Sequence, residues 1–156
     1  MSIGFHLPEA PNEISLLITL ADTLNEHPEY FRDDVKIASF FGCPPLIWNG
    51  GRMMLGPFRA DRFKATLDAY NERGIPYRFT FTNPMLTEEH LSNRECNMVL
   101  DMADNGMNEV IVYSELLENH IRKTHPNVRG AVLFCKGWMP RQLSHHCLLY
   151  WVIIAN

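Results

Sequence analysis

Apolar residues along this chain follow a helical period in some segments and a strand pattern in others, and the two kinds of segment alternate. Between residues 12 and 26 they recur at i, i+3, i+4 and i+7, which predicts a helix with one apolar face. The helical spacing holds for Leu17, Leu20, Ala21 and Leu24. Residues Val35 to Phe41 form a compact β-branched and aromatic run, which predicts a strand.

The second pair of elements has clear boundaries. A helical pattern from Arg59 to Arg73 ends at Gly74, a residue suited to a left-handed C-cap. Strict alternation from Tyr77 to Thr82 then predicts a strand with aromatic residues on one face and polar residues on the other. The Asn83-Pro84 pair ends this strand.

The third and fourth units repeat the scheme. Thr87 is a helix cap before an apolar stripe that runs to about Asp104. A strand is expected from Glu109 to Tyr113. Ser114 then caps a helix from Glu115 to Lys123, and a last strand is expected from Val128 to Cys135.

Strands and helices that alternate through short connections are typical of right-handed βαβ crossovers and a parallel sheet. We therefore predict an α/β fold of parallel β/α units. The chain has about four strands where a TIM-type barrel needs eight, so the prediction is a partial barrel over residues 1–135. The apolar tail, residues 136–156, is either a buried terminal element or the altered end of a longer protein.

The composition of the chain disfavours a nucleic-acid-binding surface and a membrane span. Hydrophobic residues make up 46% and charged residues 21% of the 156 residues, with a net charge of -4. Because no Lys/Arg block is longer than two residues, a nucleic-acid surface is disfavoured. The longest apolar run, Cys147 to Ala155, is too short to span a membrane. The four cysteines form no C-x-x-C pair and follow no signal peptide, which favours a reduced cytoplasmic compartment.

In parallel β/α folds, ligands bind at the carboxyl ends of the strands. The long connection after the first predicted strand carries Asn49, Gly50, Gly51 and Arg52, whose N–H groups and guanidinium suit a phosphate or carboxylate. Trp48 would supply a stacking wall. The alternative is a tight turn with an exposed arginine and a tryptophan packed beneath it.

Further candidates lie on the next strands. Arg78 would point into the barrel lumen, and with Asn83 it would line the same mouth; in an open sheet it would be solvated. Ser114 is a candidate contact whose plainer role is the helix cap. Cys43 is a candidate nucleophile or metal ligand, and its plainer role is that of a small buried thiol. The sequence assigns no catalytic residue and no metal site.

The segments GCPPLIWNGGR, RFTFTN and NEVIVYSELLENHIRKTHPNV resemble the first βα units of the collagenase-like peptidases, a family of unassigned catalytic type. The resemblance covers about residues 35 to 128. It implies a β/α barrel and a hydrolytic or cluster-dependent reaction on a peptide or an RNA-linked substrate. Many relatives carry a cysteine-ligated iron–sulfur cluster further along the chain. This sequence departs from the pattern at GAVLFCKGW and has no later cluster cysteines, so no cofactor is expected here.

Three hypotheses follow. The chain is the amino-terminal half of a barrel-type protein, with an anionic or peptide ligand at the predicted mouth. Alternatively, it is a non-enzymatic α/β binding module, or a truncated product without activity. In the truncated case the open sheet edges would favour a homo-oligomer.

Overall fold

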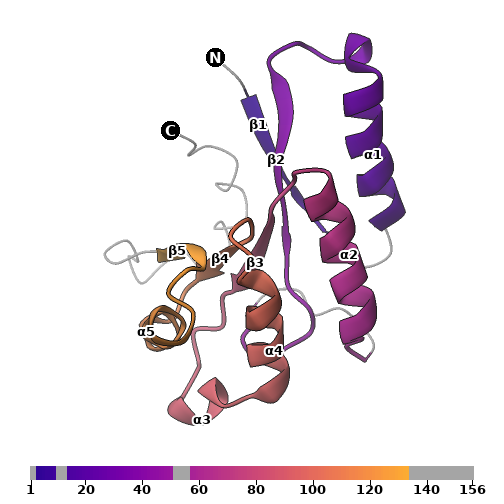
Figure 1. Ribbon diagram of the computed structural model, residues 1–156. Coiled ribbons are helices and arrows are strands. Elements are labelled where there is room, and N and C mark those ends of the chain that lie inside the picture. Colours follow the sequence, from indigo (N-terminus) through magenta and orange to yellow (C-terminus); the bar gives the residue numbers. More distant parts are fainter. Residues whose placement is uncertain (1–2, 10–13, 51–56, 134–156) are drawn as a thin grey trace, which may run out of the picture.

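The computed structural model describes residues 3–9, 14–50 and 57–133, with side chains as far as Arg129. Five strands alternate with helices along the chain (Figure 1). The strands are β1 (Ile3–Pro8), β2 (Val35–Gly42), β3 (Tyr77–Phe81), β4 (Glu109–Val112) and β5 (Arg129–Leu133). The helices are α1 (Ile14–Glu26), the 3-10 turn η1 (Pro28–Tyr30), α2 (Ala60–Glu72), α3 (Glu88–Leu91), α4 (Arg94–Ala103) and α5 (Glu115–Thr124).

The five strands form one sheet in the order β1-β2-β3-β4-β5, and every neighbouring pair is parallel. This confirms the predicted α/β fold of parallel β/α units. Since each strand lies beside the next in sequence and crossovers are right-handed, consecutive helices belong on one face of the sheet. Figure 1 shows α1, α2, α4 and α5 following one another along the same side of the strands.

All four predicted strands are present, and β1 adds a fifth that the sequence analysis missed. Its six residues include Gly4 and Pro8, which weaken a strand pattern. The helix predicted from Glu88 to about Asp104 is wrong as a single element, because it divides into α3 and α4. The break falls where the Asn93 side chain accepts a hydrogen bond from Cys96 N and starts a new helix.

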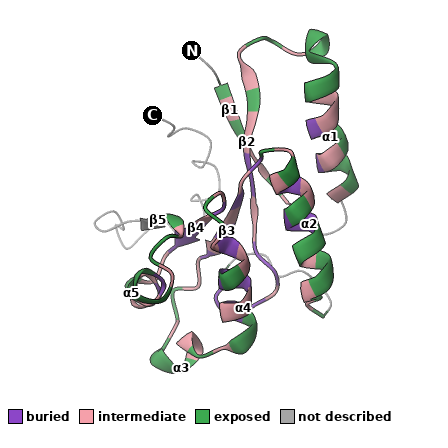
Figure 2. Cartoon of the chain, viewed as in Figure 1, coloured by how far each residue is buried: buried purple, intermediate pink, exposed green. Residues whose placement is uncertain are grey.

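The core lies between β3 and the helices, and it is aromatic. Tyr77, Phe79 and Phe81 are fully buried, as the alternation along β3 predicted. Phe63 of α2 makes edge contacts with Tyr77 and Phe79, at 5.8 Å and 6.0 Å between ring centroids. Figure 2 shows buried residues along the strands and on the helix sides that face them. The alternate residues of each strand therefore point to the face that these helices do not cover.

Amide side chains hold the starts of β3 and β4 together. Asn108, 1% exposed, accepts a hydrogen bond from Tyr77 N at 2.8 Å and another from Asn71 Nδ2 at 2.9 Å. Asn105 Nδ2 donates to Asn71 Oδ1 at 2.7 Å. These bonds join the end of α2 to the β4 entry, and they satisfy a backbone N–H that would otherwise be buried without a partner.

None of the helices within the described ranges has the length and hydrophobicity needed to span a bilayer. The apolar tail predicted for residues 136–156 lies outside the described residues.

Candidate functional site

A row of polar side chains crosses the face of the sheet opposite the helices. His6 on β1 and Ser39 on β2 are joined by a hydrogen bond of 2.7 Å between Nδ1 and Oγ. On β3, Arg78 Nη1 lies 3.4 Å from His6 Nε2, and Arg78 Nε donates to Glu109 Oε2 on β4 at 2.6 Å. Four consecutive strands thus contribute one member each to a connected chain. We call His6, Ser39, Arg78 and Glu109 the polar row.

The contacts of His6 indicate which of its two ring nitrogens carries the proton. An arginine guanidinium can only donate, so His6 Nε2 accepts from Arg78 and the ring proton sits on Nδ1, which donates to Ser39 Oγ. Burial of the ring, and then the nearby charge of Arg78, lower the pKa of His6 below its ordinary value of 6.5, while Glu109 acts in the opposite direction. The neutral imidazole is therefore the form that this arrangement favours.

Among the described residues, the charged side chains on this face are mostly cations, although the net charge of the chain is negative. Arg129, an exposed residue on β5, is the register partner of Glu109, so Glu109 lies between Arg78 and Arg129 on one face. Lys36 pairs with Gly4, two residues before His6, and adds a third cation to this face. Three cations and one carboxylate leave an excess of positive charge, whereas the net charge of the chain is -4.

The polar row does not contain an accessible nucleophile. Ser39 is fully buried, so its Oγ cannot reach a substrate even though His6 is adjacent. The two described cysteines, Cys43 and Cys96, are also buried, and burial raises the pKa of each thiol, that of Cys96 to about 11. Cys43 is therefore the small buried thiol rather than a nucleophile. No three His, Cys, Asp or Glu side chains gather into a metal-binding group within the described ranges.

A second cluster lies at the carboxyl end of β1. Tyr77 Oη donates to Glu9 Oε2, and the parallel Tyr70 ring stacks on Tyr77 with centroids 6.2 Å apart. A Cβ at Gly42 would lie 2.7 Å from Tyr77 Oη, so only glycine fits beside this contact. Burial raises the pKa of Glu9, and the tyrosine hydrogen bonds partly offset the increase. This carboxyl is partly buried and is held by the hydrogen bond from Tyr77 Oη.

The connection after β2 packs against the end of β3. Trp48 is fully buried; its Nε1 donates to His90 O at 2.9 Å, and its carbonyl accepts from Asn83 N at 3.0 Å. A Cβ at Gly50 would come within 2.5 Å of Thr82 O, so the two backbones touch. Asn83 Nδ2 donates to Ile47 O at 2.6 Å. The predicted neighbourhood of Gly50 and Asn83 is thus present, with Trp48 beneath the connection rather than exposed as a stacking wall.

The other predicted ligand contacts are spread over the molecule. Arg78 is the second residue of β3, whereas Asn83 follows its end, about 16 Å away at the rise of a strand. β3 separates the two residues along its length, and the prediction that they line one mouth stays a prediction. Ser114 accepts from Leu117 N and caps α5, its plainer role. Asn49 is buried, 8% exposed, and Gly51 and Arg52 lie outside the described residues.

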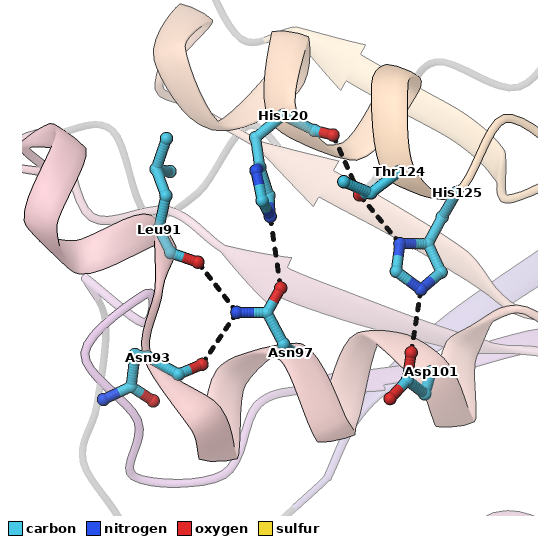
Figure 3. Close-up of polar contacts among 7 residues, drawn as sticks. All are labelled: Leu91, Asn93, Asn97, Asp101, His120, Thr124 and His125. Carbon is cyan, nitrogen blue, oxygen red and sulfur yellow. Dashed lines mark hydrogen bonds and ion pairs between the residues drawn. The ribbon is translucent and has the colours of Figure 1, made fainter.

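Polar contacts also join α4 and α5 on the outer side of the sheet (Figure 3). Asn97 accepts at Oδ1 from His120 Nε2 at 3.1 Å, while its Nδ2 donates to Leu91 O and Asn93 O. His125 Nε2 contacts Asp101 Oδ1 at 2.9 Å. The amide of Asn97 is fully used by its neighbours, so this set fastens helices to one another and offers little to a ligand.

Sequence reasoning singled out Arg78 but missed its partners. His6 and Ser39 lie on strands whose register shifts between Phe5 and His6, and β1 was not recognised. Glu109 was expected as a strand residue, and its position directly opposite Arg78 depends on the register of β3 with β4. A histidine, a serine, an arginine and a glutamate on four consecutive parallel strands are the signal that recognition of β1 would have supplied.

Comparison of the chain with protein-family models, with curated proteins and with solved structures finds no match. The resemblance to the collagenase-like peptidases stays a prediction.

Proposed function

We propose that this chain is a β/α-barrel-type module that binds an anionic ligand on the sheet face opposite its helices. The observation that carries the proposal is the position of Arg78, held between His6 and Glu109 on that face. A guanidinium takes a carboxylate or phosphate through paired N–H donors, and Glu109 uses only Nε. Nη1 of Arg78 lies beside His6 on the same face.

The strand order supports a barrel-type role. Five parallel strands in consecutive order, with helices on one side, are the arrangement found along the wall of a TIM-type barrel. In such a barrel the side opposite the helices faces the lumen, which places the polar row inside. A closed barrel has about eight strands, whereas the described residues supply five, so closure would need further strands.

Exposed apolar residues at the β1 edge support self-association as the source of those strands. Ile3 and Phe5 are 43% and 42% exposed, and β1 has no neighbour on its outer side within the described sheet. We expect light scattering to give a mass above that of one chain, and Phe5→Lys to return the mass to a monomer. A monomeric wild-type protein would remove this part of the proposal.

Ligand-dependent stabilisation tests the binding function. Phosphate, sulfate, citrate and an acidic peptide should raise the melting temperature of the wild type, since a ligand that binds only the folded state stabilises it. Arg78→Met should abolish the effect. Arg122→Met is the matched control, because Arg122 pairs with Glu118 on the outer surface of α5. Equal stabilisation of the Arg78 variant and the wild type would reject the site.

We prefer a binding module to a hydrolytic enzyme because the candidate nucleophiles are buried. The side chains that could act as nucleophiles near a base, Ser39 and Cys43, are inaccessible in the structure described. A peptidase assay on the purified chain tests the alternative directly. Activity lost with Arg78→Met and kept with Arg122→Met would favour the enzyme.

A further inference from the structure

The weak contact between His6 and Arg78 suggests both the class of the anion and a way to control its binding. At 3.4 Å, the contact between Arg78 Nη1 and His6 Nε2 is longer than the usual 2.9 to 3.0 Å of such bonds, so it is weak. The stronger bonds of the two side chains are made to other partners, Ser39 for His6 and Glu109 for Arg78. The Nη edge of Arg78 and Nε2 of His6 are therefore the groups left to share a ligand.

We infer that the polar row binds a tetrahedral oxyanion of the phosphate type across the neighbouring nitrogens Arg78 Nη1 and His6 Nε2, and that His6 takes up a proton when the anion binds. This inference rests on the proposed anion-binding function and makes it specific. A carboxylate has two coplanar oxygens, which one arginine edge satisfies. A phosphate or sulfate presents oxygens in more than one plane and can accept from Arg78 and His6 together.

Hydrogen bonding couples the protonation of His6 to the binding of the anion. Neutral His6 accepts at Nε2 from Arg78 and donates at Nδ1 to Ser39. Protonated His6 keeps the bond to Ser39 but places a second N–H donor against the guanidinium, and this donor–donor contact is repulsive. An anion that bridges the two groups accepts a hydrogen bond from each donor. By reciprocity, the anion must then raise the affinity of His6 for its proton.

The charges around His6 set the starting point of this equilibrium. Ser39 on β2 is neutral, Arg78 on β3 disfavours the protonated ring, and Glu109 on β4 favours it. Lys36, the register partner of Gly4, adds a cation on the same face of β2. Without a ligand, burial and the cations favour the neutral form of His6. Acidification protonates the ring and so adds a second N–H donor for an anion.

Sulfate is the probe that isolates the histidine, because its charge is constant between pH 5.5 and 8, whereas a phosphate monoester titrates near pH 6. Calorimetric titration between pH 5.5 and 8 should show the affinity of the wild type for sulfate rising as the pH falls, by up to about tenfold per pH unit. His6→Gln should bind sulfate with an affinity that does not change with pH. Arg78→Met should not bind at any pH, and His125→Gln, altered on the outer helix layer, should behave as the wild type.

The outcomes separate the two proposals. Absence of sulfate binding by the wild type at every pH overturns both. Binding that is independent of pH, or that responds to pH equally in His6→Gln, overturns the role of His6 and leaves anion binding standing. Acetate that binds as tightly as sulfate overturns the tetrahedral class. Inorganic phosphate and phenyl phosphate, compared at one pH, distinguish a free ion from the phosphate group of an organic ligand.

Discussion

Arg78 and Glu109 face each other across β3 and β4, with Nε 2.6 Å from Oε2. Their side chains are 31% and 29% exposed, so the pair is partly screened by solvent. Its net contribution to folding is therefore modest, about 1 kcal/mol. The larger consequence is for binding, because Glu109 competes with any anion for Arg78.

We expect Glu109→Gln to strengthen the binding of sulfate several-fold while it changes the free energy of unfolding by no more than about 1 kcal/mol. The amide keeps an acceptor for Arg78 Nε but removes the competing charge. Calorimetry and urea denaturation measure the two quantities. Weaker binding in this variant would show that Glu109 orients Arg78 rather than competing with the ligand.

The two faces of β3 should respond differently to truncation. Phe79 is fully buried among aromatic rings, and we expect Phe79→Ala to lower the free energy of unfolding by about 3 to 5 kcal/mol. Thr80, the next residue, points to the opposite face and is half-buried. Thr80→Ala should cost less than about 1 kcal/mol by the same urea titration. Similar losses in both variants would contradict the assignment of the two faces.

Alanine substitutions at two glycines compare the cost of a packing clash with the cost of a strained backbone conformation. Ala at Gly50 would bring its Cβ within 2.5 Å of Thr82 O and 2.8 Å of Asn83 Cα, both backbone atoms, so the connection must move. We expect a loss of about 1 to 3 kcal/mol and faster exchange of the Trp48 indole N–H, which donates to His90 O. Gly74, with φ of 71°, has no atoms near its missing Cβ. Gly74→Ala should cost about 1 kcal/mol and leave the indole exchange unchanged.

The partly buried carboxyl of Glu9 should produce a pH dependence of stability. Because burial raises its pKa in the folded state, the folded protein holds a proton that the unfolded chain loses above about 4.5. The free energy of unfolding should therefore fall as the pH rises from that value toward the folded pKa. Glu9→Gln removes the ionisation and should flatten this part of the curve, measured by urea titrations from pH 4 upward.

Glu26→Gln, on the exposed end of α1, serves as the control for Glu9 and should keep the slope of the wild type. A Glu9 variant with an unchanged slope would mean that Tyr77 stabilises the carboxylate enough to cancel the effect of burial.

Much of the fold was predictable because local patterns decide it. The alternation from Tyr77 to Phe81 defined a strand with one buried face, and Ser114 marked the start of α5, as the structure has them. The break between α3 and α4 was not predictable from periodicity, because one side chain, Asn93, starts the new helix by accepting from Cys96 N. β1 was missed because its glycine and proline weaken the strand pattern.

The sequence by itself determined the alternation of strands and helices, their parallel direction, and the polar character of one face of β3, since these follow from hydrophobic period and connection length. Only the tertiary structure decided which polar groups meet. His6 and Arg78 are 72 residues apart, and their contact depends on the register shift in β1 beside Phe5 and on the pairing of β3 with β4. A shift of one residue would turn Arg78 to the helix side, so register, a property of paired strands, creates the site.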